Sequence, residues 1–234
     1  MEAVCWSDYL CPWCYVAQHR DVLLRRLGVT VVHLPYELHP EIGPEGRKIR
    51  PDGRLRATFD RIEAECARAG LPFRRPEHMP NTRRALETAE VVRQRRPDAF
   101  PALHAGLFAA QFATGERLDD PTVLDTIVAA AGGPPDVVRA AVDAGEGRTL
   151  VDASMVRARG AGVTSTPTWV IGEGFVVPGA LDPATMERWV TKLLARHDRA
   201  AGAAPGSGPQ HEEQPEERAG RRGARPSTSE ESAG

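Results

Sequence analysis

The chain has 234 residues, of which 41% are hydrophobic, and a formal net charge of −2. The length fits one large domain or two small ones, and the charge gives no overall basic character of the kind that indicates nucleic-acid binding. No apolar run approaches a membrane span, and residues 1–4 show no leader pattern. Four cysteines are too few for a secreted domain held by disulfides. We therefore expect a cytoplasmic protein that interacts with neither membranes nor nucleic acids.

The first expected strand leads into a pair of cysteines. Residues 3–6 are short and apolar, and Cys11-Pro12-Trp13-Cys14 follows after a brief connection. Apolar residues then recur at helical spacing up to Gly28, so Cys11 should lie at or just before a helix start. Two cysteines at this spacing can form a small disulfide ring or supply half of a metal site. A zinc site would need two more ligands, and the chain has no second pair at this spacing.

The expected position of Cys11 favours its ionised form. A helix N-terminus offers unpaired N–H groups and a partial positive charge, and both lower the pKa of a thiol. Pro12 suits the first turn, where its missing N–H costs little. We expect Cys11 to be an attacking nucleophile and Cys14, which lies one turn further in, to be a more buried resolving thiol.

A β-branched segment, residues 29–34 with an extension to residue 38, is the second expected strand. A turn-rich stretch follows from Pro40 to Gly53. Helical patterns then dominate residues 56–160, which we interpret as an inserted helical subdomain because so long a stretch cannot be a loop. The expected helices and their start signals are residues 59–69 closed by Gly70, Asn81-Thr82 before residues 85–92, residues 100–112, Asp119 or Asp120 before Pro121, Pro134-Pro135, and residues 149–159.

Beyond the helical segment the pattern changes to two short strands, residues 168–171 and 175–177, joined by a glycine-containing turn. Asp182-Pro183 begins a final helix. From about Arg199 onward there is no aromatic residue and no aliphatic residue larger than alanine, which predicts disorder. The expected organisation is a domain made of residues 1–55 and 161–198, an insertion of residues 56–160, and a tail of residues 199–234.

The order of strand, Cys-Pro-Trp-Cys, helix, strand, helical block, Thr-Pro, hairpin and helix resembles the DsbA-like thioredoxin-fold oxidoreductases. Residues 7–15, Ser-Asp-Tyr-Leu-Cys-Pro-Trp-Cys-Tyr, resemble the cytoplasmic FrnE-like branch, as do Asn81-Thr82 with Ala85 and residues 162–171. The resemblance extends from residue 2 to about residue 197. It implies an α/β protein, a thioredoxin fold with a large inserted α-helical subdomain.

The resemblance also implies an activity and its site residues. Proteins of this kind exchange disulfides with protein or small thiol substrates, glutathione among them, and use no cofactor and no metal. Cys11 and Cys14 would be the catalytic pair. Pro12 and Trp13 would tune the reduction potential of this pair and contribute to substrate binding. Thr166-Pro167 matches the family position of a cis proline beside the pair, where Thr166 offers its main chain to an extended substrate.

One position departs from the family pattern. Many thioredoxin-fold proteins carry a buried acid six residues before the first cysteine, and this chain has Cys5 there. Cys5 is either a small core residue or, beneath Cys14, a third redox thiol or a weak proton relay. Asp8 and Glu37 are the nearest acids in the sequence, but the sequence alone brings neither close enough to act as a base. Cys66 lies on an apolar helical stripe and is expected in the core.

Two other functions remain open. Relatives of this fold isomerise 2-hydroxychromene-2-carboxylate or bind glutathione, although they generally carry a serine where this chain has Cys11. The second alternative is a peptide-binding chaperone that uses the groove between the helical subdomain and the thioredoxin core. An insulin-reduction assay distinguishes both from disulfide exchange.

Overall fold

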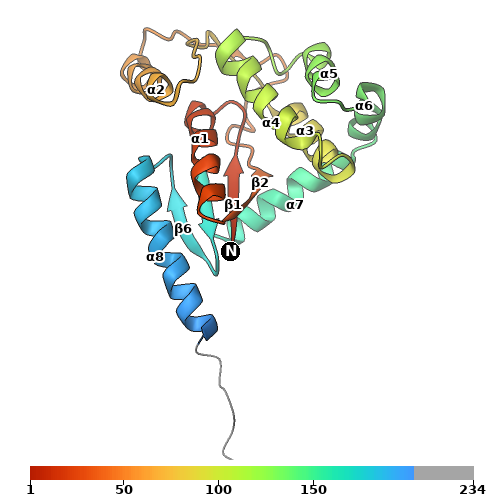
Figure 1. The fold of residues 1–234 in the computed structure, drawn as a ribbon. Helices are drawn as coiled ribbons and strands as arrows, with labels where there is room; N and C mark the ends of the chain where they lie inside the picture. Colours follow the sequence, from red (N-terminus) through yellow and green to blue (C-terminus); the bar gives the residue numbers. More distant parts are fainter. Residues whose placement is uncertain (203–234) are drawn as a thin grey trace, which may run out of the picture.

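A four-stranded sheet lies at the centre of the computed structural model, which describes residues 1–202 (Figure 1). The strand order is β2-β1-β5-β6, with β1 and β2 parallel and β5 antiparallel to both β1 and β6. Two strands come from the beginning of the chain and two from far along it. Their bounds are β1 Glu2–Ser7, β2 Thr30–Pro35, β5 Thr168–Ile171 and β6 Phe175–Pro178.

Helices cover both faces of the sheet because β1 is apolar on both sides, as a central parallel strand requires. Ala3 and Cys5 share one core with α1 (Pro12–Arg26) and α8 (Pro183–Gly202). Val4 and Trp6 share a second core with the end of α7 (Glu146–Gly160). The sheet is therefore the middle layer between α1 and α8 on one side and α7 on the other.

The stretch between β2 and β5 contains the inserted helices, which lie together at one end of the sheet (Figure 1). Their core is continuous with Tyr9, Cys11, Cys14 and Tyr15, so the insertion packs directly against the start of α1. The predicted fold, a thioredoxin fold with a helical insertion, is confirmed. The inserted elements before α7 are α2 Arg56–Ala69, α3 Arg83–Arg95, α4 Phe100–Ala109, a π-helical turn at Ala110–Thr114, α5 Pro121–Ala130 and α6 Pro135–Asp143.

Most helix ends lie where local signals predict them. Pro12, Pro121 and Pro135 each open a helix, where a residue without an N–H leaves no bond unmade. The Asp120 side chain accepts the N–H of Thr122 at 2.9 Å and caps α5. No helix within residues 1–202 is both long enough and apolar enough to cross a membrane.

Some boundaries differ from the sequence expectation. β2 ends at Pro35 and does not extend to residue 38, because the N–H of Leu38 donates to the side chain of Asp8. α7 begins at Glu146, before the expected start at Thr149. A two-stranded sheet of β3 (Arg47–Lys48) and β4 (His78–Met79) was not expected, because strands this short carry no periodicity. α8 continues to Gly202, and the rest of the expected tail, residues 203–234, lies outside the described residues.

Candidate active site

Cys11 lies at the N-terminus of α1, as its flanking sequence predicts. It is the N-cap residue, with an extended backbone (φ −88°, ψ 111°), and Pro12 opens the helix. The N–H of Cys11 donates to the carbonyl of Asp8 at 3.0 Å, which closes the turn between β1 and α1. The N–H of Cys14 donates to the carbonyl of Cys11, also at 3.0 Å, so the two cysteines lie at the two ends of one helical turn.

The two thiols are free, and their surroundings separate their pKa values. The pKa of Cys11 is lowered, chiefly because the thiol of Cys14 donates to its sulfur, and burial opposes this effect. The Thr166 side chain and the backbone N–H of Cys14 also lower it. The pKa of Cys14 is raised, first by burial and then by Cys11. This arrangement favours a Cys11 thiolate beside a protonated Cys14, which is the division of roles that thiol exchange requires.

The loop before β5 contacts this pair directly. The Thr166–Pro167 peptide bond is cis, and the sulfur of Cys11 lies 3.4 Å from the carbonyl oxygen of Thr166. Within the described residues the buried hydroxyl of Thr166 has no hydrogen-bond partner, which leaves it available to the Cys11 sulfur. Pro167 and Cys14 line the same small cavity.

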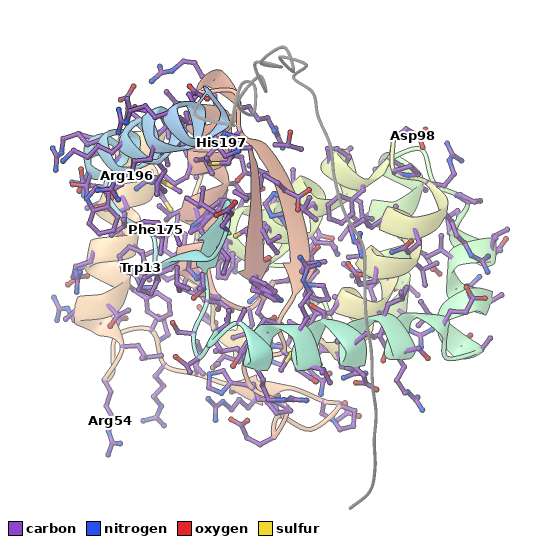
Figure 2. All side chains as sticks on the ribbon, turned by 90° about the horizontal axis from the view of Figure 1, so that it is seen from below. Trp13, Arg54, Asp98, Phe175, Arg196 and His197 are labelled. Atoms are coloured by element: carbon purple, nitrogen blue, oxygen red, sulfur yellow. The ribbon has the colours of Figure 1, made fainter. Side chains whose placement is uncertain are left out.

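Trp13 lies at the rim of this site. Its ring is partly buried against the core of the insertion, and the guanidinium of Arg61 on α2 stands 5.6 Å from the ring centre. This distance suits a cation–π contact. In Figure 2 Trp13 and Arg54 lie toward the same side of the molecule, and Asp98 lies on the opposite side. The structure thus gathers Cys11, Pro12, Trp13, Cys14, Thr166 and Pro167 at one place.

Asp8 is a site residue that sequence reasoning did not place. It is fully buried, and its backbone N–H donates to the sulfur of Cys14. Its Oδ1 accepts the N–H of Leu10 at 3.2 Å and the hydroxyl of Thr82 at 2.7 Å. Its Oδ2 accepts the N–H of Leu38 at 2.7 Å. Asp8 and Thr82 each stand in a stretch quoted above for the resemblance, but nothing in the sequence joined the two.

The surroundings of Asp8 couple it to the cysteine pair. Burial raises its pKa to about 6, although its three hydrogen bonds oppose the shift. Its negative charge in turn raises the pKa of Cys11. Glu37, the other acid considered, instead forms an ion pair with Arg83 at 3.0 Å. The acid beside the pair therefore lies three residues before Cys11, and not at the family position that Cys5 occupies here.

The other two cysteines lie in the interior. Cys5 is buried in the core between the sheet and α1, and burial raises its pKa. Cys66 lies in the core of the insertion, as expected. Within the described part of the chain, no group of three or more His, Cys, Asp or Glu side chains is arranged to hold a metal ion.

Comparison with known proteins identifies the family. Residues 3–190 match the model of the DSBA-like thioredoxin domain. A probable DsbA oxidoreductase from Streptomyces coelicolor has a similar structure, with 24% identity, a TM-score of 0.74, and coverage of 89% of this chain and 93% of its own. A 2-hydroxychromene-2-carboxylate isomerase is similar with 17% identity and a TM-score of 0.69, covering 86% and 99%.

The cytosolic disulfide reductase DsbM from Pseudomonas aeruginosa, solved with GSH, has 17% identity and a TM-score of 0.59 and covers 83% of this chain and 100% of its own. At these identities the three structures show a shared fold. The family model, by contrast, spans most of the chain and includes the cysteine pair, the insertion and the Thr166–Pro167 loop. This protein therefore belongs to the DSBA-like thioredoxin domain family.

Proposed function

We propose that this protein is a thiol–disulfide oxidoreductase of the cytoplasm, in the FrnE-like branch that its sequence resembles. The observation that carries this proposal is the position of the Cys11 sulfur. It lies at a helix N-terminus, accepts a hydrogen bond from the Cys14 thiol, and is 3.4 Å from the carbonyl of Thr166. A lowered pKa at a cysteine with a second thiol in contact is the arrangement that redox cysteines use.

The exchange runs in two steps. The Cys11 thiolate attacks one sulfur of a substrate disulfide, which forms a mixed disulfide and releases the other substrate sulfur as a thiolate. Cys14 then loses its proton and attacks the Cys11 sulfur. The Cys11–Cys14 disulfide forms, and the second substrate sulfur leaves. The substrate disulfide has been reduced to two thiols and the protein pair oxidised. The same steps in reverse oxidise a dithiol.

The substrate-binding residues follow from what surrounds Cys11. While Cys11 carries a proton, its S–H donates to the carbonyl of Thr166. In the mixed disulfide this donor is gone, so the carbonyl becomes available to a substrate N–H and can start a short strand pairing beside Pro167. Pro12 and Trp13 flank Cys11 at the start of α1 and are the further proposed substrate contacts. The proposed substrates are extended protein segments and small thiols, and the similar DsbM solved with GSH supports glutathione among the latter.

The cysteine pair distinguishes this proposal from the isomerase alternative. The similar 2-hydroxychromene-2-carboxylate isomerase shares the fold. Disulfide exchange, however, is what two contacting thiols with separated pKa values support. The chaperone alternative predicts that removing either thiol leaves the activity of the protein unchanged.

Insulin reduction with a thiol donor tests the proposal through Cys11→Ser. We expect activity to fall to the uncatalysed background, because a hydroxyl at this position cannot form the mixed disulfide. Cys66→Ala is the matched control, since it removes a buried thiol on α2 in the core of the insertion, and it should retain wild-type activity. Full activity in Cys11→Ser would refute the redox function. Inactive wild-type protein that still suppresses insulin aggregation would favour the chaperone alternative.

A further inference from the structure

A buried histidine–aspartate pair lies beneath the cysteines. His33 on β2 and Asp21 on α1 are 9% and 6% exposed, and the Nε2 of His33 is 2.8 Å from the Oδ2 of Asp21. The other polar atom of each side chain, His33 Nδ1 and Asp21 Oδ1, is buried without a hydrogen-bond partner in the described residues. Buried polar atoms are seldom left unpaired, so the free ring nitrogen calls for an explanation.

His33 borders a cavity that it shares with the resolving cysteine. A cavity of about 10 Å³ is lined by Cys14, His33, His104 and Pro167, among others. Cys5 pairs with His33 in the register of β1 and β2 and lines the same cavity. This volume is the size that one water molecule needs, and thiol and imidazole groups supply polar partners for it. Cys14 and His33 therefore face a common space that can hold one bridging water.

Asp21 orients the ring of His33. A carboxylate at 2.8 Å holds the N–H of His33 on Nε2, so that Nδ1 carries the free lone pair. The same carboxylate stabilises the ring once it has gained a second proton, which is the role that an acid plays behind a histidine base. Arg25, 4.0 Å from Asp21 and largely exposed, connects the pair to the surface of α1.

The remaining titratable groups around His33 are less suited to accept a proton. The His104 ring stacks on it with 4.3 Å between centroids, but burial lowers the pKa of His104 well below its usual value. Nδ1 of His104 is also engaged by the Tyr9 hydroxyl at 2.9 Å. The pKa of Cys5 is raised by burial. On the far side, Glu90 of α3 lines a second small cavity with His33 and is paired with Arg93 at 2.6 Å.

Asp8 is the remaining rival, and its contacts argue against it. Both of its carboxylate oxygens already accept hydrogen bonds, from two backbone N–H groups and the Thr82 hydroxyl. Its contact with Cys14 is made by its backbone N–H, which donates to the sulfur and takes no proton from it. Among the side chains that line the cavity with Cys14, His33 thus has the buried ring nitrogen without a hydrogen-bond partner in the described residues.

We propose that His33 accepts the proton of Cys14 through one water molecule when Cys14 resolves the mixed disulfide, and that Asp21 positions His33 for this step. The inference rests on the proposed function. The S–H bond of Cys14 breaks, and its proton passes through the water to Nδ1 of His33. The Cys14 thiolate then attacks the Cys11 sulfur, the Cys11–Cys14 bond forms, and the substrate sulfur leaves with the electron pair of the broken bond. His33 later returns this proton from Nδ1 to solvent through the water in the cavity, and Asp21 stays ionised throughout.

The two steps can be timed separately with dithionitrobenzoate, a chromogenic aromatic disulfide. Reduced protein releases one coloured thiolate when Cys11 attacks and a second when Cys14 resolves the mixed disulfide. In His33→Gln we expect the first release to be unchanged and the second to slow by about 100-fold at neutral pH, the typical worth of a general base. The defect should shrink as pH rises, because hydroxide can then deprotonate Cys14 directly.

Two further variants make the result specific. Asp21→Asn leaves the ring in place but removes the carboxylate, so it should also slow only the second release, and it serves as the test if His33→Gln does not fold. His39→Gln is the matched control, because His39 is a partly exposed histidine hydrogen-bonded to Glu41, and both of its releases should match the wild type.

An unchanged second release in His33→Gln, or equal slowing of both releases at every pH, would overturn the proposal. Failure of the proposed function looks different, since wild-type protein would then release no second thiolate at all. If the wild type releases both thiolates and His33→Gln does so at the same rates, the role of His33 as proton acceptor is rejected, and the proposed disulfide exchange still stands.

Discussion

At the scale of single residues, Cys11 and Cys14 are made different by a few contacts that other parts of the chain provide. The Cys14 thiol lowers the pKa of Cys11, whereas the charge of Asp8 raises it. Thr82, at the N-cap of α3 in the insertion, donates to Asp8 and helps to keep Asp8 ionised although Asp8 is fully buried. The reactivity of Cys11 is thus a balance between a neighbouring thiol and a buried carboxylate.

The variant Asp8→Asn tests this balance. Asp8 titrates at about 6, so above that pH its negative charge disfavours the Cys11 thiolate. Removing the charge should shift the pKa of Cys11 to a lower value, so that alkylation by iodoacetamide becomes faster above about pH 6, where Asp8 is ionised in the wild type. The rate of alkylation of Cys11 as a function of pH measures this shift.

Asp98→Asn is the control for that shift. Asp98 is exposed, forms an ion pair with Arg96 at 3.1 Å, and lies across the molecule from Trp13 in Figure 2. Its variant should leave the alkylation profile unchanged. A profile for Asp8→Asn that moves to higher pH, or does not move, would show that Asp8 does not set the pKa of Cys11.

At the scale of elements, the inserted helices complete the site as well as covering the sheet. α3 supplies Thr82 at its N-cap, α4 supplies His104 and α2 supplies Arg61, and all three residues lie around the start of α1. Arg83 joins α3 to α7 through Asp152 at 2.7 Å and to the segment after β2 through Glu37. The packing of α3 on α7 therefore holds the donors of Asp8 in place.

Gly147 tests that packing. It lies in the first turn of α7, where an added Cβ would come within 2.6 Å of the Cβ of Glu87 and 2.7 Å of its carbonyl oxygen. Gly147→Ala should therefore push α7 away from α3 and lower the free energy of unfolding by about 1–3 kcal/mol. Chemical denaturation followed by circular dichroism measures the change.

Gly160 at the other end of α7 is the matched control, because a Cβ there would meet nothing within 4 Å. Gly160→Ala should raise the free energy of unfolding slightly, by about 0.4–1 kcal/mol, through the reduced entropy of the unfolded chain. Equal effects of the two substitutions would mean that the α3–α7 contact is not tight at Gly147.

Local signals were sufficient to predict the elements but not the contacts between them. The Cys-x-x-Cys spacing, the prolines at helix starts and the glycine turn between β5 and β6 each act within a few residues. The helices and strands that they predict are present in the structure. The contacts of Asp8 with Leu38 and Thr82 join residues that no spacing rule connects. The His33–Asp21 pair was missed for the same reason, since an isolated histidine in an apolar strand carries no signal of its partner.

At the scale of the whole molecule, the fold brings a segment from before the helical insertion and one from after it together at the site. The cysteine pair follows β1, and Thr166 and Pro167 lie in the loop before β5. Because β1 and β5 are neighbours in the sheet, this juxtaposition is fixed by backbone hydrogen bonds rather than by side chains alone. The helical insertion lengthens the chain between them without separating them.

The central claim is that Cys11 and Cys14 form and break a disulfide with each other. Peptide mass mapping of alkylated protein, after equilibration in glutathione buffers of increasing oxidised fraction, measures this directly. We predict one reversible disulfide joining Cys11 to Cys14, with Cys5 and Cys66 remaining thiols throughout. A Cys11–Cys14 pair that stays reduced in every buffer, or a dominant disulfide that contains Cys5 or Cys66, would contradict the account.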